Sequence, residues 1–283
     1  MGHFVQVNGI RLHCLEHPGG EPLVVLLHGL TANAHCFEGL VRAGLSPRFR
    51  VVSVDLRGRG LSDKPPRGYS MADHAADILG LLDTLGARPV VLGGHSFGGL
   101  LTLYIASHWP ERVSRMLIFD AAGAMHPRVR ELLAPSLARL GKVLPSVEAY
   151  LAAVRQAPYL EGQWGTEFEE YFLADVKENP DGTAQSRASP EPIAEAMEGA
   201  LSEPWFEHLA RAPQPALLLN APQGFGPPGA PPVVPRELGL EAAGGRPDCR
   251  YIEVPGNHYT MLYGNPAGHM VRAITDFLSD RSQ

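Results

Sequence analysis

A serine with glycines two residues before and two residues after it lies between a short apolar strand and an apolar helix. The serine is Ser96, the glycines are Gly94 and Gly98, the strand is Val90–Leu92, and the helical stretch is residues 100–109. A strand, a sharp turn and a helix around Gly-x-Ser-x-Gly lift the serine oxygen above the edge of a sheet. The glycines are needed because the turn strains the backbone and brings the helix close to the strand. This setting predicts an exposed, reactive hydroxyl.

Short apolar runs alternate with helical patterns along most of the chain. Such runs are typical of strands buried on both faces of a parallel sheet. They are Leu23–Leu27, Val51–Val54, Val90–Leu92, Met116–Phe119, Ala216–Leu219 and Tyr251–Val254. Before them, Asn8-Gly9 predicts the turn of a β-hairpin, and a capping box at Ser70 predicts a helix that ends before Gly86. The alternation predicts an α/β layer structure with right-handed crossovers.

The alternation breaks once, in residues 123–212. This segment contains no convincing strand, and its Ala, Leu, Glu and Arg residues with scattered prolines predict several short helices. An insertion at the carboxyl end of a sheet strand lies where ligands bind in α/β folds, so we interpret it as a cap over Ser96. The alternative is that these helices pack against the flank of the sheet. The core domain is then residues 1–122 and 213–283, with an irregular loop at 221–235.

Charge and composition argue against several classes of partner. The net charge is −6 at pH 7, the pI is near 6.0 and no basic stripe is present, so we expect neither nucleic acid nor an acidic membrane surface as a partner. The N-terminal segment lacks a basic stretch followed by an apolar core, and no apolar run is long enough to span a bilayer. We expect a cytoplasmic protein that is a monomer or a homodimer.

The three cysteines are Cys14, Cys36 and Cys249, and their spacing matches no zinc or C-x-x-C motif. Free thiols in a reducing compartment are the favoured interpretation, with a single disulfide as the alternative. The glycine-rich segments fit neither a phosphate-binding loop nor a dinucleotide-binding turn, and no H-E-x-x-H motif is present. We therefore expect no metal and no cofactor.

A serine hydroxyl needs a base within hydrogen-bond reach to act as a nucleophile at neutral pH. Among the twelve histidines, His258 is the leading candidate, because it follows the last predicted strand and so lies at the same sheet edge as Ser96. The alternative for any single histidine is a packing role. His28 is a second candidate base, but its place inside a turn favours a structural role. His95, next to the serine, is expected to point away from it.

The base in turn needs an acid to hold its tautomer. Asp120 follows the strand Met116–Phe119, and an aspartate at the end of a buried strand is costly without a partner. The alternative is that Asp120 caps the following segment. Glu237, far along a loop, and Asp248, before the last strand, are weaker candidates for the acid.

Acyl transfer also needs donors aimed at the developing oxyanion. The first parallel strand closes in Leu26-Leu27-His28-Gly29-Leu30, beside the serine turn. We expect the backbone N–H groups of Leu30 and Phe97 to be these donors. Further along, Asp55 and Arg57 are expected to form a local ion-paired turn instead of a ligand site.

Together these residues resemble the α/β-hydrolase superfamily, in its capped esterase and lipase-like branch. The resemblance is carried by the His28-Gly29 turn, the Asp55-x-Arg57-Gly58-x-Gly60-x-Ser62 turn, the Gly-His-Ser-Phe-Gly-Gly segment around Ser96 and the closing Gly256-x-His258. It implies a mostly parallel eight-stranded sheet, a helical cap after the sixth strand, hydrolysis of ester-like bonds and no cofactor. In this superfamily the chain order is Ser, Asp, His.

The chain departs from the common family pattern at two points. Related dehalogenases and epoxide hydrolases carry aspartate where this chain has Ser96, so their chemistry is not expected. The acid of the family most often follows the next-to-last strand, where this chain has no Asp or Glu before Glu237. Some members, including polyketide-type thioesterases, place the acid one strand earlier, as Asp120 would be.

The predicted function is a serine carboxylesterase that cleaves a small-molecule ester through an acyl-enzyme. The predicted substrate-binding residues are Leu30, Phe97, Trp164, Tyr171, Trp205 and Tyr259. Further candidates for the lining of the acyl pocket are Leu132, Leu133, Leu137, Val154, Tyr159, Leu160, Phe168 and Phe172. An apolar pocket suits short or medium acyl chains or an aryl ester. The alternatives are a thioesterase or lactonase with the same triad, and a ligand-binding receptor on a hydrolase scaffold with little turnover.

Overall fold

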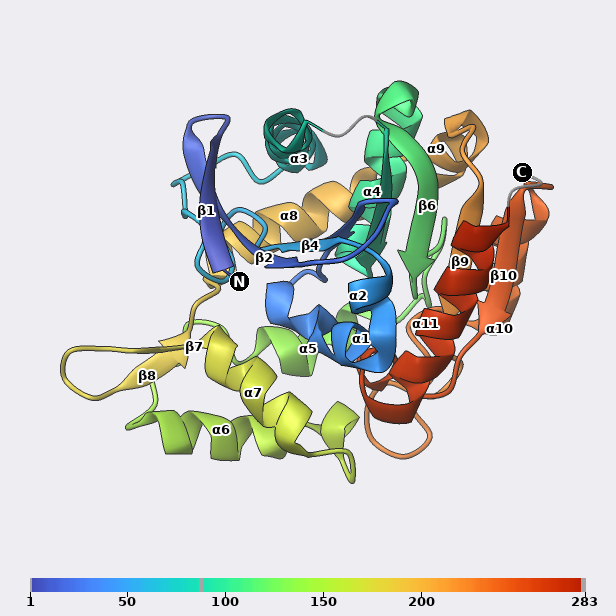
Figure 1. Ribbon diagram of the computed structural model, residues 1–283. Helices are drawn as coiled ribbons and strands as arrows, with labels where there is room; N and C mark the ends of the chain where they lie inside the picture. The colour runs from blue at the N-terminus through green and yellow to red at the C-terminus, as the bar shows by residue number, and fades with distance from the viewer. Residues whose placement is uncertain (1, 87–88, 281–283) are drawn as a thin grey trace.

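Within the described residues, 2–86 and 89–280, the computed structural model has an eight-stranded sheet at its centre (Figure 1). The strand order is β1-β2-β4-β3-β5-β6-β9-β10. The strands are β1 (Gly2–Val7), β2 (Ile10–His17), β3 (Val24–Leu27), β4 (Val51–Val54), β5 (Val90–His95), β6 (Val113–Phe119), β9 (Ala216–Asn220) and β10 (Cys249–Glu253). The β1–β2 and β2–β4 pairs are antiparallel and the other pairs are parallel, which confirms the predicted α/β class.

The helices surround this sheet. They are α1 (Glu38–Leu40), α2 (Ser46–Arg48), α3 (Met71–Leu85), α4 (Phe97–His108), α5 (Val129–Leu137), α6 (Val147–Arg155), α7 (Thr166–Asp175), α8 (Pro190–Ser202), α9 (Trp205–Arg211), α10 (Arg236–Gly244) and α11 (Gly264–Ser279). Shorter turns of 3₁₀ or π helix are η1 (Ala34–Phe37), η2 (Val41–Leu45), η3 (Pro110–Arg112), η4 (Pro158–Leu160) and η5 (Thr260–Leu262).

Local sequence signals explain where several elements begin and end. The β1–β2 hairpin turns at Asn8-Gly9, where both residues have positive φ, as predicted. Ahead of α3, the Ser70 hydroxyl accepts the N–H of Asp73 at 3.2 Å, and the Asp73 carboxylate accepts the N–H of Ser70 at 3.0 Å. The same helix ends at Gly86, in the left-handed conformation that favours glycine.

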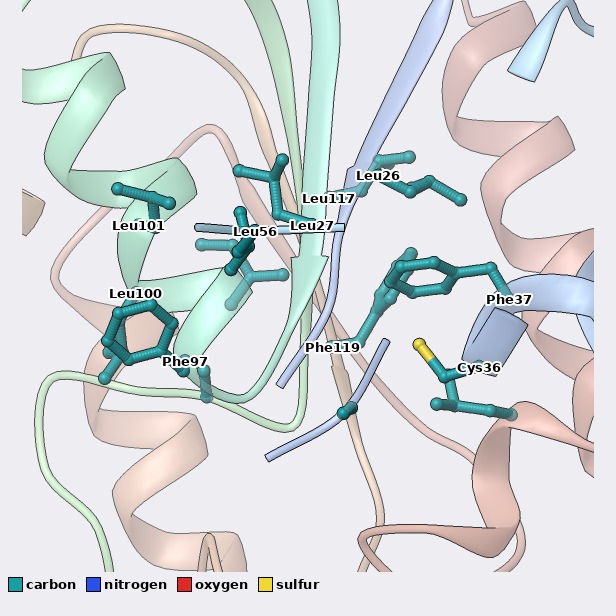
Figure 2. Close-up of a cluster of buried hydrophobic side chains, with 14 of the residues drawn as sticks. Leu26, Leu27, Cys36, Phe37, Leu56, Phe97, Leu100, Leu101, Leu117 and Phe119 are labelled. Carbon is teal, nitrogen blue, oxygen red and sulfur yellow. The ribbon is translucent and has the colours of Figure 1, made fainter. Parts of the chain in front are cut away.

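The core lies on both faces of the sheet. Helix α4 packs on β3, β5 and β6, while α11 packs on β9 and on the segment of α1 and η2. Figure 2 shows Phe97, Leu100 and Leu101 from α4 to one side of the strands, and Cys36 and Phe37 from η1 to the other. All five side chains are buried. Both faces of the parallel strands are therefore covered by other parts of the chain, as the unbroken apolar runs of these strands require.

The segment between β6 and β9 holds α5 to α9 and a second, two-stranded sheet of β7 (Val176–Glu178) and β8 (Ala184–Ser186). Figure 1 shows this hairpin together with α6 and α7, outside the main sheet. The expectation of no strand in this segment was wrong. The two strands are three residues each and largely polar, so they lack an apolar periodicity, and only the turn residue Gly182, with φ of 82°, marks the hairpin.

The register of the parallel strands brings their carboxyl ends to one edge of the sheet. Leu27 of β3 pairs with Gly94 of β5, His95 of β5 pairs with Phe119 of β6, and Phe119 pairs in turn with Leu219 of β9. The residues that follow these four strands therefore meet at the same edge. This edge is where ligands bind in open α/β sheets.

The turn from β5 into α4 is tight. Ser96 has a φ of 54° and a ψ of −118°, a conformation that L residues seldom adopt. A Cβ on Gly98 would lie 1.9 Å from the carbonyl oxygen of Leu27, so α4 begins directly against β3. Glycine is required at position 98 because nothing larger fits between the helix and this strand.

The turn after β3 is held by His28. Its Nε2 accepts the N–H of Leu56 at 3.0 Å, which fixes the proton on Nδ1, and Nδ1 donates to the carbonyl of Gly29 at 2.7 Å. Burial lowers the pKa of His28 to about 4 because the charged form loses its water. His28 is therefore a neutral support of the turn, consistent with the structural interpretation of this residue.

We expect Gly98→Ala to lower the free energy of unfolding by at least about 3 kcal/mol, because the added methyl group collides with a carbonyl oxygen of the buried strand β3. Gly165→Ala is the matched control, since a Cβ there meets no atom within 4 Å and its φ is not in the left-handed region. Gly165→Ala should change the free energy of unfolding by no more than about 0.5 kcal/mol. Urea unfolding followed by circular dichroism measures both, and equal midpoints for the two variants would contradict this account.

Stability should also fall as pH is lowered from about 6.5 towards 4. In the unfolded chain His28 takes up a proton near pH 6.5, whereas in the folded protein burial holds its pKa near 4, so the folded state binds fewer protons in this window. The pKa difference corresponds to roughly 3 kcal/mol of unfolding free energy. Burial lowers the pKa of His74 and His95 as well, which adds to the trend.

Urea midpoints at pH 7 and pH 5 measure this dependence. The control is His28→Gln, whose side-chain oxygen still accepts from Leu56 but carries no titrating group. We expect a shallower loss of stability in this variant than in the wild type. The same slope in both proteins would assign the pH dependence to other groups.

Candidate active site

Asp120 is the fully buried acid at the end of β6. It has a φ of 47°, and its Oδ2 lies 2.6 Å from Nδ1 of His258. The Nδ1–H of His258 therefore donates to the carboxylate, and in the neutral ring Nε2 is left as the proton acceptor. The structure thus brings together two residues that are 138 positions apart in the chain.

The other carboxylate oxygen of Asp120, Oδ1, accepts hydrogen bonds from residues at the end of β9, the strand that no acid follows. Asn220, at the end of β9, donates from Nδ2 to Oδ1 of Asp120 at 2.8 Å, and the N–H of Ala221 donates to the same oxygen at 2.9 Å. Tyr251 fixes the amide orientation, because its hydroxyl donates to Oδ1 of Asn220 at 2.8 Å. A buried carboxylate is tolerable with three donors around it. Asn220 thus positions the acid, but it carries no charge, so a prediction based on acidic residues does not include it.

His258 lies in the loop after β10, and its side chain is only 2% exposed. His95 donates from Nε2 to the carbonyl of His258 at 2.6 Å, and the two rings lie 4.5 Å apart. The ring of Phe225 meets the imidazole of His258 edge-on, with the two ring centres 5.3 Å apart. The preceding residue, Asn257, donates from Nδ2 to the carbonyl of Tyr159 in the cap segment at 3.1 Å.

The expectation for His95 was only partly right. It forms no hydrogen bond with Ser96 among the described residues, but its ring lies beside His258 and lines the cavity in front of Ser96. The reason is that β5 continues through His95, so its side chain follows the alternation of the strand instead of turning away at the bend.

Ser96 lies between two cavities that share Leu30 and Leu133. The first has a volume of about 30 Å³ and is also lined by His258 and Tyr259. The second, also of about 30 Å³, is lined chiefly by apolar residues from α4, α5 and α8. We call them the first and the second cavity. Two spaces on either side of a serine can hold the two halves of a substrate.

Ser96 and His258 face the same cavity, although no hydrogen bond joins the Ser96 hydroxyl to the imidazole within the described residues. In enzymes without a bound substrate, such contacts are often long and tighten only in the complex. The separate positions of the two groups are therefore compatible with proton transfer between them.

The predicted oxyanion donors lie on the two turns that meet at Ser96. In the part of the chain that the structure describes, neither the N–H of Leu30 nor that of Phe97 has a hydrogen-bond acceptor. Arg59 supports both residues from behind, since its Nε donates to the carbonyl of Leu30 at 3.0 Å and its guanidinium lies 5.4 Å from the centre of the Phe97 ring. Arg59 is fully buried, and burial lowers the pKa of its guanidinium to about 9. The sequence reasoning missed this residue.

Of the six predicted substrate-binding residues, three line the two cavities. Leu30 and Tyr259 line the first, and Leu30 and Phe97 line the second. Leu133 and Leu137, also expected in an apolar pocket, line the first cavity as well. These residues follow strands or face inward from α5, which is why their positions could be inferred from the predicted sheet edge.

Trp164, Tyr171 and Trp205 do not appear in either lining. Trp164 stacks on Phe172 with ring centres 5.8 Å apart, and Trp205 donates from Nε1 to the carbonyl of Ala200 at 2.7 Å. Tyr171 packs against Tyr259 and Tyr263, with ring centres 6.4 Å apart in each case, so these aromatic residues pack among protein side chains. Sequence alone marks them as apolar and gives no indication of which neighbour they will cover.

The turn after β4 differs from its prediction. Asp55 and Arg57 do not pair with each other: Asp55 contacts Nδ1 of His13 at 2.8 Å and accepts the N–H of Ala34 at 2.7 Å, whereas Arg57 pairs with Asp77 of α3 at 2.6 Å. The two side chains point to opposite neighbours because the turn lies between β2 and α3. The role is structural, as expected, but the partners are distant in sequence.

Among the described residues, no group of His, Cys, Asp or Glu side chains is placed to hold a metal ion. Cys14, Cys36 and Cys249 are free thiols. None of the described helices combines the length and apolar character needed to cross a membrane.

Comparison with known proteins places these features in a family. The family model described as alpha/beta hydrolase fold matches residues 22–212. A crystal structure of E-2-(acetamidomethylene)succinate hydrolase superimposes with a TM-score of 0.86 at 26% identity and covers 99% of both chains. In sequence, the 2-(acetamidomethylene)succinate hydrolase of Mesorhizobium japonicum is 36% identical over 151 residues, which are 52% of this chain and 54% of that protein.

A soluble epoxide hydrolase of a Corynebacterium species is 36% identical over 118 residues, 42% of this chain and 41% of that protein. The chain thus spans about half the length, or less, of these curated relatives. The match of the family model is longer and includes the serine turn and the strand that leads to Asp120. This chain therefore belongs to the alpha/beta hydrolase fold family.

Proposed function

We propose that the protein is a serine hydrolase that cleaves carboxylic esters through an acyl-enzyme. The observation that carries the proposal is the buried Asp120–His258 hydrogen bond of 2.6 Å beside a serine on a strand-to-helix turn. This arrangement of acid, base and hydroxyl is that of a Ser-His-Asp triad. The carboxylate has no other evident use at this sheet edge, since all its partners orient it towards His258.

The proposed reaction has two halves. The Ser96 hydroxyl attacks the ester carbonyl while His258 Nε2 takes its proton, and His258 then gives that proton to the departing alkoxide. Water repeats the attack on the acyl-enzyme, with His258 again as the base, and releases the acid. Asp120 holds the ring in the Nδ1–H tautomer and stabilises the imidazolium, while the N–H groups of Leu30 and Phe97 hold the oxyanion.

The cavities support a small substrate. Their small volumes and largely apolar linings suit a short or medium acyl chain or an aryl ester. The same apparatus would act on a thioester or a lactone. The likeness to 2-(acetamidomethylene)succinate hydrolase favours a second candidate substrate, the compound that this relative is named for or one close to it.

Ser96→Ala should abolish turnover of 4-nitrophenyl esters, because the nucleophilic oxygen is removed. The control is Ser202→Ala, an exposed serine of α8, which should retain the wild-type rate. Nitrophenolate release measures both. In parallel, a fluorophosphonate should phosphonylate Ser96 with loss of fluoride, so that the mass of the phosphonyl group is added to wild type and not to Ser96→Ala. Unchanged hydrolysis by Ser96→Ala contradicts the mechanism, and tight ligand binding without any acyl-enzyme would favour a receptor.

Asp120→Asn should lower kcat by about 10³- to 10⁴-fold, because the amide no longer favours the Nδ1–H tautomer of His258. Glu237→Gln is the control at the rival acid, which is exposed on α10. We expect no change from it. Circular dichroism checks that both variants fold. A near-normal kcat in folded Asp120→Asn would move the role of the acid to another residue.

A further inference from the structure

Three buried side chains on the cap side of the first cavity carry polar atoms without a hydrogen-bond partner. Within the described residues, these atoms are Nε and Nη1 of Arg139 and the hydroxyls of Tyr171 and Tyr263. The side chain of Arg139 is 10% exposed, and the two tyrosines are 1% and 5% exposed. Buried polar groups in native proteins almost always have a partner, so a cluster of orphans indicates a missing one. We call these three residues the donor cluster.

The donor cluster reaches the cavity that contains Ser96 through Tyr263, whereas Arg139 lines another cavity together with Tyr150 and Val154. Tyr263 lines the first cavity directly. Arg139 donates from Nη2 to the carbonyl of Thr31 at 2.7 Å, and Thr31 is another lining residue. The ring of Tyr171 lies 6.4 Å from that of Tyr263 and 6.4 Å from that of Tyr259, which also lines the cavity.

The cluster offers donors to an acceptor. A guanidinium can only donate, and burial raises the pKa of Tyr171 and Tyr263 well above its usual value, so both hydroxyls keep their protons. The nearest carboxylate, Asp175, lies 3.6 Å from Nη2 of Arg139, and it is already bonded by the hydroxyls of Tyr150 and Ser186. Asp175 therefore leaves Nε and Nη1 of Arg139 unused.

We propose that Arg139, with Tyr171 and Tyr263, binds a carboxylate carried by the substrate, so that the compound cleaved at Ser96 is an anionic half-ester or its equivalent. A carboxylate supplies several acceptor sites and the charge that a buried guanidinium favours. Leu133, Leu137 and Leu262 line the same cavity and would enclose the short apolar chain between the two ends. This substrate class rests on the hydrolase function proposed above.

The opposing explanation is that Arg139 has only a structural role, as the ion-pair partner of Asp175 and the support of Thr31. Both of these contacts are made by a single atom of the guanidinium, Nη2. The guanidinium also lies 5.9 Å from the centre of the Phe172 ring, but none of these contacts supplies an acceptor for Nε and Nη1 or for the hydroxyls of Tyr171 and Tyr263. The two explanations differ in what they predict for the selectivity between charged and neutral substrates.

The first test compares two esters of the same shape, monoethyl succinate and ethyl 4-methylpentanoate, in which an isopropyl group replaces the carboxylate. We expect wild type to show at least a tenfold higher kcat/KM for the anionic ester. In Arg139→Met the ratio of the two kcat/KM values should fall to about one. The control is Arg128→Met, an exposed arginine paired with Glu131 near the same helix, which should keep the wild-type ratio. Equal rates for both esters in wild type overturn the proposal while the esterase function stands.

The second test does not depend on turnover. Succinate binding to Ser96→Ala is measured by calorimetry, with and without Arg139→Met, and we expect the second change to remove the binding. If neither ester is cleaved but succinate binds through Arg139, the esterase function fails and the carboxylate site remains. If Arg139→Met does not fold, Tyr263→Phe removes a single hydroxyl and should raise KM for the anionic ester alone. Succinate binding that is unaffected by either change would refute the site.

Discussion

The hydrogen bond between the buried Asp120 carboxylate and His258 depends on strand register more than on either residue. The buried Asp120 carboxylate has hydrogen-bond donors because β9 ends level with β6, which puts the amide of Asn220 and the N–H of Ala221 against one of its oxygens. The other oxygen is then directed at the imidazole. No acid follows β9, but this strand still contributes to the site. Its terminal residues donate the hydrogen bonds that stabilise the buried carboxylate of Asp120 at the end of the neighbouring strand β6.

Much of this arrangement could be predicted, because it follows from features that act locally. Unbroken apolar runs identify strands that are covered on both faces, and β4 has the bounds that its run predicts. The glycines around Ser96 mark a place where the chain has no room for a side chain. Once the strands are parallel, the residues after them share an edge, and this places Ser96, Asp120 and His258 in one region before any coordinates are known.

The rest depends on contacts between residues far apart in the chain, which no local pattern records. Trp164 and Trp205 are large and apolar wherever they lie, and only the packing of residues 123–212 decides that they contact Phe172 and Ala200. Asp55 and Arg57 are two residues apart, yet each finds a partner on a different element. Arg59 is a charged residue in a polar turn, and nothing in that turn predicts its complete burial behind Leu30.

One contact between the two parts of the molecule has a further consequence. Asn257, directly before His258, holds the carbonyl of Tyr159 in the segment that covers the sheet edge. This bond ties residues 123–212 to the loop that carries the imidazole. A displacement of the Tyr159 carbonyl therefore removes one support of the proton acceptor, so the position of a segment remote in sequence bears on the geometry of the base.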